Sequence, residues 1–433
     1  MQRSIKFGLS LLVSGVFCAV VAGLPQPAAA TNGYFSIGYG MKATGMGGAS
    51  TATSQDTLGG ATNPASMAFV GNRLDIGVTA FNPLRSSTRS GLGPGLDGTS
   101  VSGSNLFGIP EFGYNHMANP KLALGISMYG NGGLNTNYAS GNYNCGGGPA
   151  NMLCGRGTLG VNLVQLIIAP TVAIKMSATQ AIGISPLFGY QEFTAQGLQA
   201  FAGIPGLSID PAHLTNTGPQ SSTGVGVRVG YMNQVSKAFS FGAAYATKIR
   251  MSNFTRYAGL FAGGGNFDIP ENYNFGIAFL ADPKLLLAVD YQRINYSGVP
   301  SVSDPITAPA QLGSANGPGF GWRSINVFKF GLSYKSDPNL TLRAGYNRGD
   351  NPVQARDVTI NILAPGVTTD HVSLGFTRSF AHGGELSGAF VRAFNNSVSG
   401  KSLLPAFMGG APAGNETIQL QGNSFGLAYG HSF

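Results

Sequence analysis

Two basic residues in the last third of the chain have the type and spacing to bind the polar end of a ligand. Arg323 lies six positions before Lys329, so on an extended strand both side chains point to one face, while Phe328, Phe330 and Leu332 point to the other. A guanidinium donates charge-assisted hydrogen bonds to carboxylates. We therefore predict that Arg323 orients a ligand inside the protein, with Lys329 on the same face. The alternative is an arginine at the edge of a loop, paired with an acid.

Enzyme chemistry receives little support from the sequence. Residues Ser399-Gly400-Lys401-Ser402 resemble the end of a phosphate-binding loop, but Asn395 stands where the first glycine belongs. The five histidines are scattered without the spacing of metal ligands. We expect no enzyme, no cofactor and no metal site. A lipase whose serine and histidine meet only in the fold is a distant alternative.

The first thirty residues have the pattern of a secretory signal peptide. Arg3 and Lys6 precede an apolar run, and Ala28-Ala29-Ala30 forms a small-residue cleavage site. Cleavage near Ala30 would leave two of the three cysteines, Cys145 and Cys154. Because the leader sends the chain to an oxidising compartment, we predict a disulfide between them, with two free thiols as the alternative.

The composition favours a membrane protein built from strands. Only 10% of the residues are charged, the net charge is +8, and 66 residues are glycine. After the leader, no apolar run approaches the eighteen or so residues of a spanning helix. Because only helices and closed barrels satisfy every backbone group in lipid, these facts predict a transmembrane β-barrel. An all-β sandwich is the structural alternative.

The apolar residues alternate as they do in a barrel wall. The last strand places Phe425, Leu427, Tyr429, His431 and Phe433 on one face and small or polar residues on the other. The same period of two recurs at 122–128, 225–231 and 273–279. A terminal phenylalanine on such a strand is typical of the signal that the barrel assembly machinery reads, which predicts the bacterial outer membrane.

Turn lengths give the number of strands. Six short turns occur near residues 118–120, 177–180, 235–237, 282–283, 337–339 and 381–384, and seven long Gly- and Pro-rich connections lie between them. Six turns and seven long loops require fourteen antiparallel strands, with the short turns in the periplasm. We expect residues 71–433 to form one all-β barrel.

A plug is predicted before the barrel, over residues 31–70. This stretch is rich in glycine, alanine, serine and threonine, so it cannot build its own core and needs an enclosing wall. Its last part contains Asn63-Pro64-Ala65, where the proline restricts the preceding residue. We expect a small hatch with short helices.

The chain resembles the FadL family of outer-membrane transporters for long-chain fatty acids and other hydrophobic compounds. The resemblance lies in the glycine-rich stretch ending at Asn63-Pro64-Ala65, in IPEFGYNHMANPKLALGISMYGNGGL at 109–134, and in GWRSINVFKFGLSYKSDPNLTLRAGYNRGDNPVQARDVTI at 321–360. It implies a fourteen-stranded barrel with an N-terminal hatch. It also implies passive transport, in which a ligand lands among the outer loops, moves inside the barrel, and leaves sideways through a kinked strand.

The resemblance also assigns roles to particular residues. Family members place a lysine against the ligand carboxylate in a context that Gly321-Trp322-Arg323 matches here. The stretch FGYQEFTAQ at 188–196 departs from the family because it offers Glu192 and no base, which puts a fatty acid substrate in doubt. The lateral exit is expected at Gly130, Asn131, Gly132 and Gly133, beside Asn63-Pro64-Ala65. Alternatively, these glycines only begin the second long loop.

Apolar residues in two long loops predict a landing site for ligand. An exposed apolar patch usually marks a binding surface. The alternative is that the side chains pack against one another within the loops. The residues are Leu198, Phe201, Ile204 and Leu207 in one loop and Leu260 and Phe261 in the next.

The sequence therefore predicts a transporter for a hydrophobic small molecule, either a fatty acid or a hydrocarbon. A general porin, or a structural or adhesion barrel, is the alternative; a porin should carry a charged constriction and no plug. The expected partners are outer-membrane lipid, lipopolysaccharide and the assembly machinery, without nucleic acid, and a monomer is expected.

Overall fold

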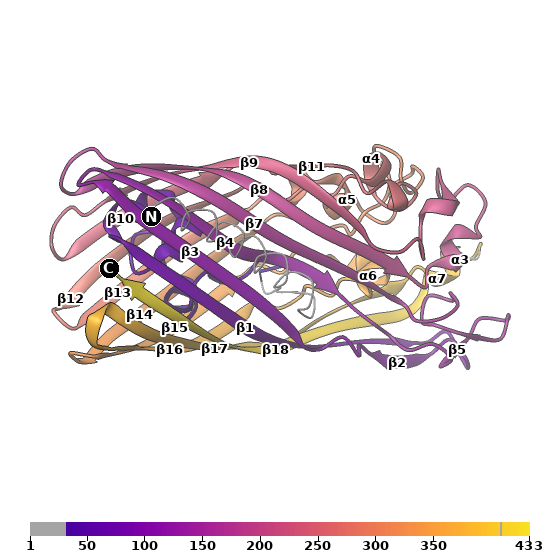
Figure 1. The fold of residues 1–433 in the computed structure, drawn as a ribbon. Coiled ribbons are helices and arrows are strands. Elements are labelled where there is room, and N and C mark those ends of the chain that lie inside the picture. Colours follow the sequence, from indigo (N-terminus) through magenta and orange to yellow (C-terminus); the bar gives the residue numbers. More distant parts are fainter. Residues whose placement is uncertain (1–31, 408) are drawn as a thin grey trace, which may run out of the picture.

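The computed structural model describes residues 32–407 and 409–433, so the predicted signal peptide and its cleavage site lie outside the described residues. Its main sheet contains 16 strands, of which the short β2 and β11 are additions to a closed wall of fourteen. Each wall strand pairs antiparallel with its neighbours, and β1 pairs with β18 to close the barrel (Figure 1). The fourteen-stranded barrel predicted from the turns is confirmed. The wall strands are β1 Arg73–Ser90, β3 Phe107–Asn119, β4 Leu122–Asn135, β7 Gly160–Lys175, β8 Gln180–Gln196, β9 Gln220–Asn233, β10 Phe239–Ala246, β12 Asn272–Asp282, β13 Leu285–Ile294, β14 Ile325–Asp337, β15 Leu340–Gly349, β16 Asp370–Ser379, β17 Gly384–Ser402 and β18 Ala413–Ser432.

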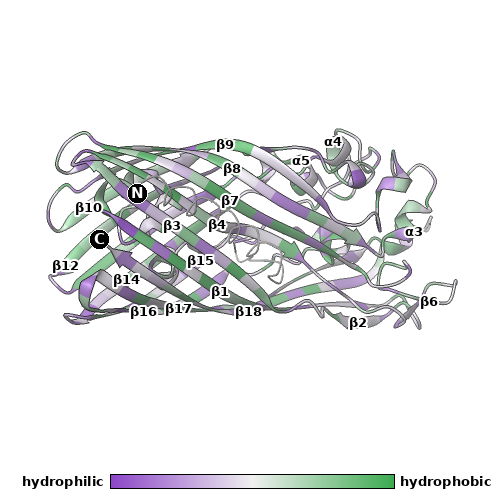
Figure 2. Ribbon diagram, viewed as in Figure 1, coloured by the Kyte–Doolittle hydropathy of each residue, from purple (hydrophilic) through white to green (hydrophobic). Residues whose placement is uncertain are grey.

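Strand residues alternate between an apolar outer face and an inner face of small or polar residues. On β12, Phe275, Ile277 and Phe279 are exposed, while Asn272 and Asn274 are buried inside. This is the pattern that a barrel wall needs when lipid surrounds it. Apolar residues recur along the strands in Figure 2. Within the described residues, no helix is both long and apolar enough to span a membrane.

The two ends of the barrel differ in the length of their connections. Short turns join β3–β4, β7–β8, β9–β10, β12–β13, β14–β15 and β16–β17 at one end, and long loops join the strands at the other. Short helices and strands also occur after residue 70, all of them in the long loops except η7, which lies in the β16–β17 turn. They are β2 Gly98–Val101, β5 Tyr143–Asn144, β6 Pro149–Ala150, α3 Gln199–Ala202, η3 Pro211–His213, β11 Arg250–Met251, η4 Thr255–Tyr257, α4 Ala262–Gly265, η5 Tyr296–Gly298, α5 Pro300–Ser303, η6 Ala355–Asp357, α6 Val358–Asn361, η7 Ala381–Gly383 and α7 Leu404–Phe407.

Residues 32–70, here called the N-terminal segment, lie within the ring of strands. The segment forms α2 Met41–Thr44, η1 Thr57–Ala61 and η2 Pro64–Phe69, and most of its residues are buried. Its backbone or side chains bond to strands on opposite sides of the barrel, including Ser127 on β4, Asp290 on β13 and Ser373 on β16. The small residues of the segment allow this close approach. Figure 1 shows the segment inside the ring of strands.

Candidate functional site

An apolar chamber lies between the long loops, inside the outer end of the barrel. Its lining includes Val161 and Phe193 of the wall, with Leu260, Phe261, Leu312, Phe320, Ile360 and Leu363 from the loops. The remaining free volume is ≈ 20 Å³, about enough for one water molecule. Side chains therefore fill the chamber almost completely, and a ligand must displace them to enter.

A row of aromatic side chains connects the chamber with the N-terminal segment. The ring centroids of Phe193 and Phe261 are 4.7 Å apart, those of Phe261 and Phe267 4.9 Å, and those of Phe267 and Tyr34 6.2 Å. Phe35 follows 5.5 Å from Tyr34. These separations place neighbouring rings in contact. We call these five residues the aromatic row.

Two further aromatic residues support the inner end of the row. The rings of Tyr296 and Trp322 lie 5.1 and 5.8 Å from Tyr34, and Trp322 is 1% exposed. The Tyr296 hydroxyl accepts a hydrogen bond from the backbone N–H of Tyr34 and donates one to the carbonyl of Asn32. The first residues of the N-terminal segment are thereby held against the loop that precedes β14.

The aromatic row ends at an opening between β3 and β4. The ladder between these strands stops at the pair Glu111–Tyr129, although β4 continues to Asn135 on its pairing with β7. A bulge interrupts the β4–β7 register between Gly130 and Gly132. We call this unpaired interval the β3–β4 gap. A cavity of ≈ 70 Å³ lies here, lined by the N-terminal segment and by β1, β3, β4, β17 and β18.

The N-terminal segment takes the place of β3 along the gap. Phe35 forms a bridge with Gly132, the Ser36 N–H donates to the Asn131 carbonyl (3.2 Å), and the Gly133 N–H donates to the Tyr34 carbonyl (3.3 Å). Backbone groups that β3 leaves unpaired are therefore satisfied from inside, as a wall in lipid requires. Movement of residues 34–36 would leave the gap open.

A chain of neutral hydrogen bonds runs from the gap to the loops. The Tyr39 hydroxyl donates to Asn131 Oδ1 (3.1 Å), and Asn131 Nδ2 donates to Gln165 Oε1 (3.0 Å). Gln165 then donates to Gln191, whose amide donates to the carbonyl of Phe267 in the aromatic row. This chain of neutral groups fixes the bulged Asn131.

A second, larger cavity opens among the outermost loops. Its volume is ≈ 330 Å³, and its lining combines Phe201 and Ile204 with Leu404, Phe407 and the loop that contains Cys145 and Cys154. We call it the outer cavity. The structure joins Cys145 to Cys154 in a disulfide, with Cα atoms 5.7 Å apart. This bond closes the loop that forms one side of the cavity.

The predicted landing residues do not form an exposed patch. Leu198, Phe201, Leu260 and Phe261 are all buried within the main apolar cluster, and Leu207 packs against it. The expectation of an exposed surface is corrected because two loops with apolar side chains in reach of each other bury them together. Phe201 and Ile204 line the outer cavity, and Leu260 and Phe261 line the chamber.

Arg323 lies on the outside rather than in the lumen. It precedes the first residue of β14, so the alternation of the strand does not extend to it. Its exposed side chain donates from Nε to the carbonyl of Asn351 (3.0 Å). Lys329, within β14, is 5% exposed and faces the interior opposite Asp290 on β13.

Arg228 on β9 is a lumen cation that sequence reasoning did not assign to the ligand site. It is 3% exposed, and its nearest acceptors are the Tyr129 hydroxyl (3.3 Å) and Asn272 Oδ1 (3.5 Å), while its Nε has no partner among the described residues. Its inward position follows from alternation with the exposed Val227 and Val229. That alternation was the available signal.

Asn63-Pro64-Ala65 lies away from the β3–β4 gap, which corrects its expected position. Asn63 caps η2 by accepting from the Ala65 N–H and donates to the Tyr231 carbonyl on β9. Gly183 on β8 leaves room for Pro64, because any side chain there would meet its backbone. The tripeptide therefore packs at the short-turn end of the barrel, and Tyr34, Phe35 and Tyr39 occupy the gap instead. In the sequence, these three residues could have been singled out because they are aromatic side chains in a stretch of small residues.

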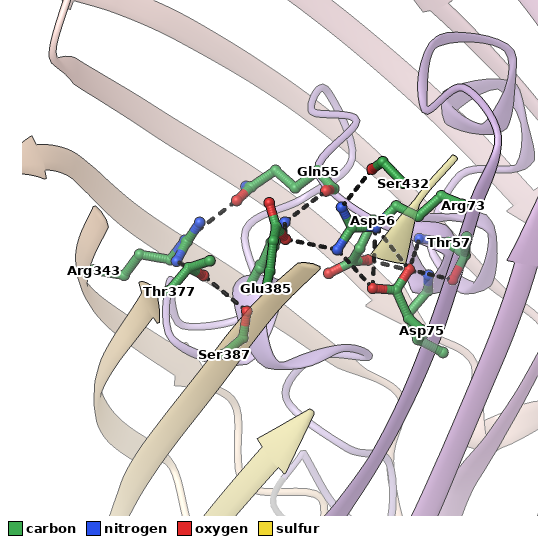
Figure 3. A network of polar contacts seen from close by, with 12 residues as sticks. Gln55, Asp56, Thr57, Arg73, Asp75, Arg343, Thr377, Glu385, Ser387 and Ser432 are labelled. Carbon is green, nitrogen blue, oxygen red and sulfur yellow. Dashed lines mark hydrogen bonds and ion pairs between the residues drawn. The ribbon is translucent and has the colours of Figure 1, made fainter. Parts of the chain in front are cut away.

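Charged residues hold the N-terminal segment to the wall at the short-turn end (Figure 3). Lys42 Nζ lies 2.7 Å from Glu385 Oε2, which also receives Arg73 Nη2 at 2.7 Å. Arg73 binds Asp75 at 2.7 Å, and the Asp75 carboxylate accepts from Thr57. We call this group, together with Asp56, the charged latch.

Burial shifts the pKa of the two latch residues that belong to the segment, Asp56 and Lys42. Desolvation, followed by the nearby Asp75 carboxylate, raises the pKa of Asp56 to about 6, although Lys42 opposes the shift. Desolvation lowers the pKa of Lys42, and Arg73 adds to this effect. Both directions favour the neutral forms of these groups, and for Lys42 the ion pair with Glu385 opposes the effect.

Neither a metal-ligand cluster nor an exposed nucleophile turn stands out among the described residues. In this part of the chain, no group of three or more His, Cys, Asp and Glu side chains is placed to hold a metal ion. Gly422, Ser424 and Gly426 match the G-x-S-x-G pattern but lie within β18, not on the strand-to-helix turn that exposes a nucleophile.

Comparison with known proteins identifies one matching family and several solved structures with the same fold. The family model described as Outer membrane protein transport protein (OMPP1/FadL/TodX) matches residues 18–403. No curated protein matches the chain. Among solved structures, the P. putida toluene transporter TodX has 16% identity and a TM-score of 0.68, with 92% of this chain and 99% of that chain covered.

Two further structures have the same architecture. A Pseudomonas aeruginosa FadL homologue has 17% identity and a TM-score of 0.66, covering 95% of this chain and 100% of that one. The Ralstonia pickettii toluene transporter TbuX has 17% identity and a TM-score of 0.61, covering 92% and 99%. At these identities the likeness concerns the fold.

Proposed function

This chain belongs to the outer membrane protein transport family (OMPP1/FadL/TodX), and we propose that it lets hydrophobic compounds cross the outer membrane passively. One observation carries the proposal. A continuous apolar cluster runs from the outer loops through the chamber to Tyr34 and Phe35, where the wall is unpaired. A water-filled porin would need a polar lumen instead.

The proposed route has four steps. A compound enters the outer cavity beside Phe201, passes into the chamber, and moves along the aromatic row. It leaves sideways through the β3–β4 gap when residues 34–36 move away from Gly132 and Gly133. On this route residues 31–70 act as the plug and residues 71–433 as the barrel.

The proposed substrates are uncharged hydrocarbons. The chamber and the aromatic row are lined by apolar side chains and supported by neutral amides, and Arg323 lies outside. Burying hydrocarbon yields about 0.8 kcal/mol per methylene, so the walls alone can hold such a ligand.

A fatty acid is the second candidate, and a specific observation favours it. Arg228 and Lys329 are both buried cations of the lumen, and within the part of the chain that the structure describes Arg228 Nε has no hydrogen-bond partner. A carboxylate there would gain about 1.5–3 kcal/mol from a charge-assisted hydrogen bond. Replacing Arg228 by Gln should weaken the binding of a carboxylate probe and leave an uncharged probe unaffected.

The route can be tested by closing the gap. A Cβ at Gly130 would lie 2.7 Å from Ile109 Cγ2 on β3, so Ile109→Cys with Gly130→Cys should form a cross-link across it. Proteoliposomes are then given naphthalene or its carboxylated counterpart 1-naphthoate, and transfer is followed by fluorescence. We expect oxidation to slow the transfer of whichever probe the protein carries and reductant to restore it. Unchanged transfer through a fully cross-linked protein would refute this route.

The remaining predictions accompany the family assignment. We propose that the leader is cleaved near Ala30, that the assembly machinery inserts the barrel through its terminal strand, and that the protein works as a monomer in contact with outer-membrane lipid and lipopolysaccharide. Mass spectrometry of the purified protein in its native detergent micelle would test the mature N-terminus and the monomer together.

A further inference from the structure

Two prolines face each other in the middle of the wall, on the neighbouring strands β7 and β8. Ile168 pairs with Phe188 and Val172 pairs with Ile184, so Pro170 and Pro186 stand directly opposite each other, but the ladder is interrupted between these pairs. Proline inside a sheet is normally confined to edges and bulges because it cannot donate. Two facing prolines inside a closed barrel therefore depart from this rule.

The missing hydrogen bonds all belong to one seam. The Lys175 N–H donates to the carbonyl of Lys121, the residue before β4, so the alternate residues of β7 that include position 170 direct their backbone groups to β8. Neither Pro170 nor Pro186 has an N–H, so both bonds of this pair are lost. Pro170 still pairs with Ile126 of β4, and Pro186 with Val227 of β9.

Only a thin layer separates lipid from the apolar interior at this seam. Flanking outward side chains, among them Val172, Ile184 and Phe188, are exposed. The inward Ala169 and Leu187 belong to the apolar cluster that contains the aromatic row. Across the seam, the inner face is joined by one hydrogen bond, between the hydroxyls of Thr171 and Ser185 (2.7 Å). Separating Pro170 from Pro186 breaks no backbone hydrogen bond, and the ladder resumes at the flanking pairs Ile168–Phe188 and Val172–Ile184.

We propose that the Pro170–Pro186 seam is a second lateral opening, through which uncharged hydrocarbons pass between the interior and the membrane. The inference rests on the proposed transport function. The six seam residues, at positions 169–171 and 185–187, carry no charge, whereas Glu111 lines the cavity at the β3–β4 gap. Arg228 lies opposite Ser185 on β9. The Arg228 guanidinium would bind the carboxylate of an acidic ligand and hold it beside the seam, whereas an uncharged hydrocarbon would pass.

A cross-link tests the seam directly. Thr171→Cys with Ser185→Cys replaces the two hydroxyls by a disulfide and should lock β7 to β8. The matched control is Thr377→Cys with Ser387→Cys, because these residues also face each other with hydroxyls in contact (2.8 Å) but lie in the uninterrupted β16–β17 ladder. Each oxidised protein is reconstituted, and the transfer of naphthalene and 1-naphthoate is measured before and after reductant.

We expect the seam lock to slow naphthalene transfer about twofold, because the β3–β4 gap remains as a parallel exit, with recovery on reduction, and to leave 1-naphthoate transfer and the control protein unchanged. Unchanged naphthalene transfer through a fully cross-linked seam would overturn the inference. Should the lock disturb folding, Pro170→Val with Pro186→Val offers a second route, since it restores both donors; it should also slow naphthalene, and equal transfer would again count against the inference.

The lock across the gap separates the two proposals. Suppose that the Ile109–Gly130 cross-link slows transfer, and that the seam lock has no effect either by itself or when added to that cross-link. The second opening is then wrong and the gap route stands. If naphthalene transfer that survives the gap lock is removed by the seam lock, the second opening is supported. If the unlocked protein transfers neither probe, the proposed function itself fails.

Discussion

Replacing Glu385 by Gln should loosen the N-terminal segment from the wall. The carboxylate binds both Lys42 and Arg73 at 2.7 Å, and the side chains of these cations are 7% and 6% exposed. Breaking a buried ion pair costs about 3–5 kcal/mol because the remaining charge is left uncompensated. Glu385 is itself 20% exposed, and Arg73 keeps Asp75, so the lower end, about 3 kcal/mol, is expected. That corresponds to about a hundredfold rise in the population with a detached segment.

Planar-bilayer recordings would count the openings, because each detachment should give a brief ionic current through the barrel. Arg378→Gln is the matched control, since its contact with Asp337 is long (3.8 Å) and exposed, and such pairs contribute about 0–1 kcal/mol. We expect frequent openings in Glu385→Gln and none beyond wild type in the control. Equal opening rates in all three proteins, together with equal protease resistance of residues 32–70, would refute the latch.

Three other predictions concern stability. Trp322→Ala should lower the free energy of unfolding by about 3–5 kcal/mol, measured in urea, because it empties a fully buried site beside Tyr34; a smaller loss than 1 kcal/mol would contradict the packing described. Burial raises the pKa of Asp56 to about 6, above its unfolded value. The wild type should therefore lose stability relative to Asp56→Asn as pH rises from about 4 to 7, by on the order of 3 kcal/mol; a pH-independent difference would contradict this. Replacing Cys145 and Cys154 by Ser should make their loop sensitive to protease, with a local loss of about 2 kcal/mol, and leave the barrel's unfolding unchanged; an intact loop would show that the disulfide does not shape it.

The barrel could be predicted from the sequence because its rules are local. Alternation fixes which face of a strand meets lipid, and each hairpin is marked by a short turn, which contains Pro or Asn in three of the six cases. The same rule placed Lys329 inside. It failed for Arg323 because that residue precedes the strand, where the backbone no longer alternates.

Loops and long-range contacts followed no such rule. Whether Leu198 and Leu260 lie exposed or buried depends on how two distant loops meet, and no periodicity encodes that. The position of Asn63-Pro64-Ala65 depends on Gly183, far along the chain, whose missing side chain admits the turn. To predict that Pro170 faces Pro186, the register of β7 and β8 must be known. That register depends on the geometry of the hairpin turn, which the sequence does not specify.

The most direct test of the central claim measures two permeabilities in one preparation. Proteoliposomes containing the purified protein are assayed for naphthalene transfer and, in the same batch, for swelling in a small sugar. A transporter with an apolar interior and a seated N-terminal segment predicts accelerated naphthalene transfer and no swelling beyond empty liposomes. Rapid swelling with no acceleration of naphthalene would show an aqueous pore and contradict the account.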